Sequence, residues 1–93
     1  MASIRRLKHE ISALANELVL ATIFKKSDIV ASDIEQINLI IFDINEFEDN
    51  FRSRSRIADK SLPSKEVKKY YKDILLDMEK SISSIIEKIN SIN

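Results

Sequence analysis

Hydrophobic side chains recur at steps of three and four residues in three long segments of the chain, which short polar connections separate. Steps of three and four place side chains on one face of an α-helix, so the pattern predicts amphipathic helices over about residues 3–26, 32–58 and 64–91. The three predicted apolar stripes comprise Ile4, Leu7, Ile11, Leu14, Leu18 and Ala21; Ile34, Ile37, Ile40, Ile41, Ile44, Phe47 and Phe51; and Val67, Tyr71, Ile74, Leu75, Met78, Ile82, Ile85, Ile86 and Ile89.

Polar residues and the single proline mark the predicted helix boundaries. Ser32 and Glu35 have the spacing of a capping box, in which the hydroxyl accepts from a free N–H and the carboxylate reaches back to an earlier one. Pro63 disfavours helix in the residue before it and so separates the second helix from the third. The other signals are the potential N-caps Ser3 and Ser64, and the cations Lys25, Lys26, Arg52, Arg54 and Arg56 close to helix C-termini, where the helix dipole favours positive charge.

The short connections determine the expected architecture. At 1.5 Å per residue each predicted helix is about 36–42 Å long. Helices joined by a few residues pack as antiparallel neighbours. We therefore expect an all-α fold over residues 1–93, a single-domain, up-down-up three-helix bundle that is elongated and resembles a coiled coil.

Several apolar side chains fall outside the predicted stripes. Scattered exposed apolar residues are normal on soluble proteins. A helix that is apolar nearly all round is usually buried all round, however, and contiguous patches mark interaction sites. The sequence therefore favours a second buried surface, most simply in a homodimer, and otherwise against another helical protein. The candidate interface residues are Val19, Leu20, Ile23, Phe24, Leu39 and Phe42.

Composition excludes several classes of site. The chain has no glycine, so it cannot form the glycine-dependent phosphate loops, dinucleotide motifs or nucleophile elbows of many enzymes. It has no cysteine and a single histidine, His9, which leaves no thiolate site and no histidine pair for a metal. We expect a protein that is not an enzyme and has no catalytic, cofactor or metal site.

The charged residues balance, with 15 basic and 15 acidic side chains. A neutral chain has no bulk attraction to nucleic acid, which makes nucleic acid an unfavoured partner. The segment Arg52, Arg54 and Arg56 is the candidate for the alternative function, an accessory protein that binds an anion or nucleic acid. Residues two apart on a helix do not share a face, so a dipole-matched, solvated helix end is the favoured interpretation.

The length of the apolar runs indicates where the protein is located, and the first residues resemble those of other proteins. The longest apolar run, Leu18–Phe24, has seven residues and is interrupted by Thr22, whereas a membrane span needs about 20, so we expect a soluble, cytoplasmic protein. The opening Met1–Lys8, followed by two more helices in fewer than 100 residues, resembles short bacterial helical proteins of the conserved-hypothetical type. That resemblance implies no activity and carries over no functional residue.

Overall fold

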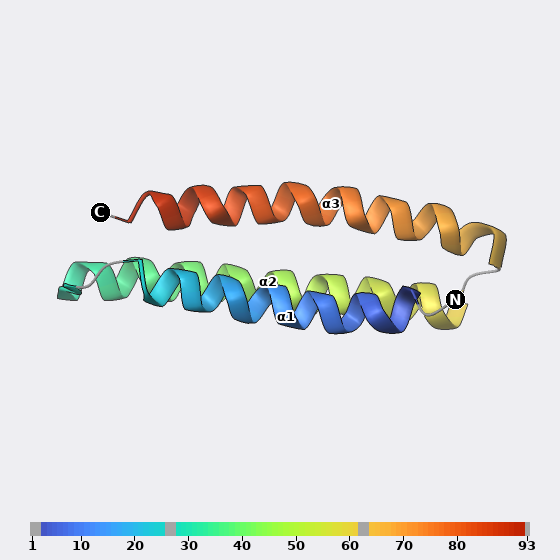
Figure 1. The fold of residues 1–93 in the computed structure, drawn as a ribbon, viewed down its shortest axis with the longest axis horizontal. Helices are drawn as coiled ribbons and strands as arrows, with labels where there is room; N and C mark the ends of the chain where they lie inside the picture. Colours follow the sequence, from blue (N-terminus) through green and yellow to red (C-terminus); the bar gives the residue numbers. More distant parts are fainter. Residues whose placement is uncertain (1–2, 26–27, 62–63, 93) are drawn as a thin grey trace.

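Three helices form nearly all of the described structure. The computed structural model describes residues 3–25, 28–61 and 64–92. These comprise α1 (Ser3–Ile23), α2 (Ala31–Ser61) and α3 (Ser64–Asn90). α1 and α3 run in one direction and α2 in the other (Figure 1). This arrangement confirms the predicted all-α, up-down-up three-helix bundle.

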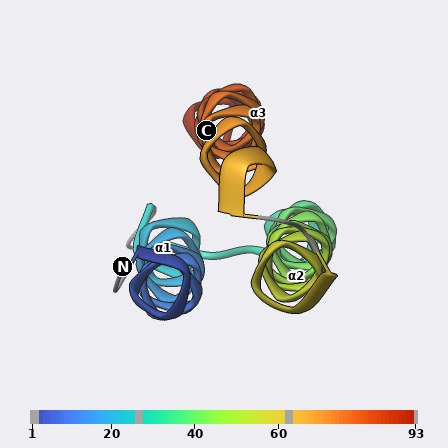
Figure 2. The same ribbon diagram turned by 90° about the vertical axis from the view of Figure 1, so that its right-hand side faces the viewer.

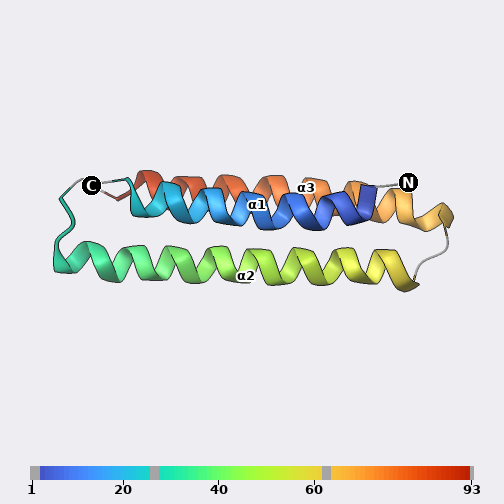
Figure 3. The same cartoon turned by 60° about the horizontal axis from the view of Figure 1, so that its bottom comes forward.

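The bundle is a rod of 50 × 18 × 15 Å. Seen end-on, the helices lie at the corners of a triangle (Figure 2). α2 is the longest and extends past both ends of α1 (Figure 3). The α1–α2 pair makes the most contacts and the α1–α3 pair the fewest. Each of the other two helices therefore packs mainly against α2.

The core is a column of apolar side chains along the axis of the rod. All three helices contribute to it, and its aromatic part is the pair Phe47 and Phe51, whose ring centroids are 5.1 Å apart. Two buried hydroxyls, on Thr22 and Ser55, each donate to the carbonyl four residues earlier, so both have a hydrogen-bond partner in the core. The buried hydrophobic residues are Leu7, Ile11, Ala15, Leu18, Ile37, Ile40, Ile44, Phe47, Phe51, Ile74, Met78, Ile85, Ile89 and Ile92.

The predicted stripe of α1 is rotated relative to the buried face. Ala15 and Thr22 are buried, whereas Ala21 is exposed and Leu14 is half-buried. The reason is the unequal packing of α1, which contacts α2 far more than α3 and so turns its buried face toward α2.

Three stripe residues of the other helices are exposed. Ile34 lies in the first turn of α2, about 100° around the helix from Asp33, whose side chain takes the buried position instead. Leu75 and Ile86 of α3 are 41% and 43% exposed, although their spacing predicts core positions. Ile86 lines the hollow between α3 and α1, and Leu75 lies about 20° from Ile86 around the helix, so both are on the side of α3 that faces α1. α1 is the neighbour with which α3 makes the fewest contacts.

The N-terminus of α2 uses a different cap from the predicted one. The helix begins at Ala31, and the Asp33 carboxylate accepts a hydrogen bond from the Val30 N–H at 3.1 Å. Ser32 and Glu35 are exposed. Because the helix starts one residue early, Asp33 occupies the third helical position, from which a carboxylate reaches back to the residue before the helix.

The helix C-termini also differ from expectation. α1 ends at Ile23, so Lys25 lies past its last turn rather than in it, and Lys26 is outside the described residues. α2 continues to Ser61, which places Arg52, Arg54 and Arg56 before its last turn. A dipole acts within the last turn, so it does not explain the arginines. The structure does not describe the side chains of the predicted caps Ser3 and Ser64, and Pro63 is outside the described residues.

Candidate interaction surfaces

Arg52 belongs to a polar bridge between α1 and α2. Its Nη1 donates to Ser12 Oγ at 2.6 Å and lies 3.7 Å from a carboxylate oxygen of Glu48. Ser12 Oγ donates in turn to Glu48 Oε2 at 2.9 Å. The guanidinium is therefore turned toward α1, where its charge is partly neutralised.

Arg54 points to a different neighbour. Its Nη1 lies 2.9 Å from Asp77 Oδ2 of α3, and its guanidinium sits 5.2 Å from the centroid of the Phe51 ring. Arg56 is exposed. Successive residues turn by about 100° on a helix, so the three guanidinium groups face α1, α3 and solvent. They do not converge on a common position where a phosphate could be held.

The seam between α2 and α3 is closed by polar side chains at the end where α2 begins. Lys88 Nζ lies 2.6 Å from Asp43 Oδ2, and Gln36 donates to Ser91 Oγ at 3.4 Å. Leu39 and Phe42 are exposed beside this bridge and line a hollow of about 340 Å³ with Lys88 and Ser91. This surface combines two apolar side chains from α2 with a charged edge of α3.

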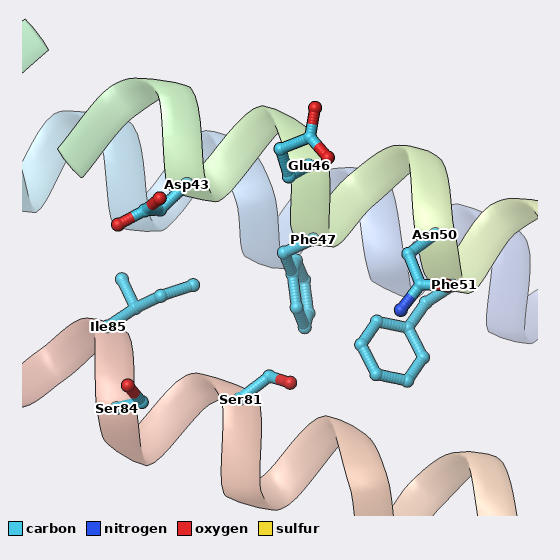
Figure 4. Close-up of a pocket in the computed structure, with 8 residues that line it drawn as sticks. All are labelled: Asp43, Glu46, Phe47, Asn50, Phe51, Ser81, Ser84 and Ile85. Atoms are coloured by element: carbon cyan, nitrogen blue, oxygen red, sulfur yellow. The ribbon is translucent and has the colours of Figure 1, made fainter. Parts of the chain in front are cut away.

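A second hollow, of about 320 Å³, lies further along the same seam. Phe47 extends from α2 toward Ser81 of α3, and the short side chains Ser81 and Ser84 leave the space open, while the Glu46 carboxylate points away from α3 (Figure 4). Across the described residues, no three histidine, cysteine or acidic side chains are grouped in a way that could hold a metal ion. His9 is exposed on α1. The hollow offers hydroxyl oxygens from α3 and carboxylate oxygens from α2.

The candidate interface residues lie on more than one surface. Val19 is half-buried and packs against the core, so it is not available to a partner in the same way as the others. Leu20 and Phe24 are exposed on α1, while Leu39 and Phe42 are exposed on α2 beside α3. Ile23 is exposed near the end of α1. The six residues therefore do not form the single patch that the sequence suggested.

The seam between α1 and α3 is largely apolar. A hollow of about 380 Å³ lies in it, and Glu17 and Asn90 are its only polar lining residues. The polar bridges described above all connect α2 with a neighbour. The apolar lining residues of the α1–α3 hollow are Leu14, Leu18, Ala21, Ile82, Ile86 and Ile89.

Sequence reasoning assigned Leu75 and Ile86 to the core and so missed them as surface residues. The width of the α3 stripe could have indicated this. The positions from Ile74 to Ile86 cover about 120° around the helix, which is wider than the strip that packing against one close neighbour buries.

Comparison with known proteins does not assign the chain to a family. No protein-family model matches it, and no match was found among curated proteins or solved structures. Among the described residues, no helix has both the length and the apolar character to cross a bilayer.

Proposed function

We propose that this protein acts in the cytoplasm through protein–protein association and that its basic unit is a homodimer. The observation that carries the proposal is the large amount of apolar surface on a small bundle. In the described residues, almost as many large hydrophobic side chains are exposed as are buried. Exposed apolar surface of this extent is typical of proteins with an interaction site.

The charge balance supports association between copies. Equal numbers of acidic and basic residues give a net charge of zero, so two copies do not repel each other through their overall charge. Proteins with little net charge associate more readily than strongly charged ones. A two-fold symmetric pair is the commonest closed assembly of identical chains.

The arrangement of the arginines does not favour the alternative function. Arg52 is bonded to Ser12 and Arg54 to Asp77, so two of the three candidate side chains connect helices. Binding an anion would require both bridges to open.

The proposal is tested by measuring the molar mass of the protein by light scattering during size-exclusion chromatography, over a range of concentrations. We expect a dimer at high micromolar concentration and a shift toward the monomer on dilution. Two variants compare the exposed end of α1 with the seam between α2 and α3. Phe24→Glu places a charge on the first, on a side chain that is 76% exposed, and Phe42→Glu places a charge on the second. The variant that weakens association identifies the surface that the dimer uses. A monomer at every concentration would contradict the proposal.

A further inference from the structure

The exposed residues of α3 form a continuation of its core stripe. Leu75, Ile82 and Ile86 are spaced by seven and four residues, so they lie on one side of the helix. Ile82 is half-buried against the core, whereas Leu75 and Ile86 are exposed. The α3 helix thus has a wider apolar face than its two neighbours cover.

α1 provides a matching apolar edge. Ala21 and Phe24 are three residues apart on the same side of α1, and the Phe24 N–H donates to the Leu20 carbonyl at 2.9 Å, which extends the helical geometry to this residue. Ala21 lines the hollow with Ile82 and Ile86. We call Ala21, Phe24, Leu75, Ile82 and Ile86 the α1–α3 face.

We propose that a second copy of this chain docks on the α1–α3 face, so that the α1 and α3 helices of one copy pack face to face against those of the other. This inference rests on the proposed function and specifies the surface that it uses. The face also carries charges of both signs, because exposed Glu10 and Glu17 lie on it in α1 and exposed Lys68 lies on it in α3. Acidic side chains of one copy can therefore meet a basic side chain of the other.

The dimensions of the bundle suit a second copy. One side of the whole rod measures 50 × 18 Å, or about 900 Å², so a second copy aligned along its full length can cover close to the ~800 Å² that each partner contributes to a stable interface. The hollow of about 380 Å³ leaves room for side chains from a facing helix. A second copy offers the same apolar face, the same length and no net charge, so it complements this surface without any change in the bundle.

The other apolar surface is less suited to pairing. Leu39 and Phe42 come from α2 alone, and the adjacent edge of α3 carries Lys88, which pairs with Asp43. Burying that edge in an interface would remove a charged pair from water, which costs free energy. The α1–α3 face, in contrast, receives exposed apolar side chains from both α1 and α3.

The test compares adjacent leucines of α3. The double variant Leu75→Glu/Ile86→Glu places two charges on the α1–α3 face. Leu76→Glu is the matched control, because Leu76 is the same residue type on the same helix, is 48% exposed and points about 100° away. Light scattering at high micromolar concentration should show a monomer for the double variant and a dimer for the control, with self-association weakened at least tenfold only in the former. Circular dichroism verifies that each variant is helical.

The outcomes separate this inference from the proposed function. A monomeric wild-type protein overturns both. A dimeric wild type whose association is weakened equally by the double variant and by Leu76→Glu, or only by Phe42→Glu, overturns the α1–α3 assignment while association stands. If the double variant does not fold, Leu75→Ala/Ile86→Ala against Leu76→Ala replaces it, with several-fold weaker association expected for the former pair and no change for the control.

Discussion

At the scale of single residues, the start of α2 depends on one carboxylate. Asp33 accepts from the Val30 N–H and is buried, whereas Glu35 is exposed and has no such role in the observed cap. We expect Asp33→Ala to lower the free energy of unfolding by about 1 kcal/mol, because a helix N-terminal N–H loses its acceptor.

Glu35→Ala is the control for this cap, and it should change the free energy of unfolding by less than about 0.5 kcal/mol. Urea denaturation followed by circular dichroism measures both variants. If Glu35→Ala destabilises the protein more than Asp33→Ala, the helix begins with the Ser32–Glu35 capping box instead.

The arginine segment makes a second prediction at this scale. Arg54 pairs with Asp77 and covers the Phe51 ring, whereas Arg56 is exposed. Asp77 is about half-exposed, so solvent screens the ion pair, and most of the expected effect comes from the ring contact and the buried stem of Arg54. Arg54→Ala should cost about 1 kcal/mol of unfolding free energy, and Arg56→Ala should be neutral within about 0.5 kcal/mol. Equal effects in thermal unfolding would show that the inter-helix contacts of Arg54 contribute nothing.

At the scale of the helices, the aromatic part of α2 is the most sensitive part of the core. Phe51 is fully buried, contacts Phe47 and lies under Arg54. Phe51→Ala should cost about 3–5 kcal/mol through lost burial and the cavity that remains. That is a large share of the 5–15 kcal/mol that stabilises a typical domain.

Phe42→Ala on the same helix is the control, since its ring is 61% exposed. At equal protein concentration it should change the midpoint of chemical denaturation far less than Phe51→Ala does. Comparable shifts for the two variants would contradict the burial assignment of α2.

The helices themselves were predictable from the sequence, because a repeat of three and four residues specifies a helix face whatever the neighbours do. The positions of Leu7, Ile44 and Ile85 at the centre of their stripes were predicted correctly and are buried. Residues at stripe edges were not, since their burial depends on how closely a particular neighbour approaches. Leu75 and Ile86 illustrate this, because no pattern within α3 reports the distance to α1.

The candidate sites were predictable to a smaller extent. The sequence identified exposed apolar residues such as Phe24 and Phe42, but not that they lie on separate surfaces. Their relative position depends on the rotation of α1 and α2 about their own axes, which cross-helix contacts determine. The start of α2 differs from the predicted start for a local reason. Asp33 and Glu35 both carry a carboxylate that could cap the helix, and only Asp33 accepts a hydrogen bond from the Val30 N–H.

At the scale of the whole molecule, folding and association are linked in this account. Only folded chains associate into the dimer, so a higher protein concentration should raise the midpoint temperature of thermal unfolding. Calorimetry across a hundredfold concentration range checks this, with Leu75→Glu/Ile86→Glu as the comparison. The midpoint of the double variant should be independent of concentration. A wild-type midpoint that does not move with concentration would contradict the linkage.

The central claim is that two copies of this 10.7 kDa chain associate through the face shared by α1 and α3. Light scattering of the wild-type protein and of Leu75→Glu/Ile86→Glu at the same high micromolar concentration tests it most directly. The account predicts a mass of about 21 kDa, twice that of the chain, for the wild type, and the mass of a single chain for the double variant. A wild-type mass equal to one chain, or a double variant that stays at twice that mass, would contradict it.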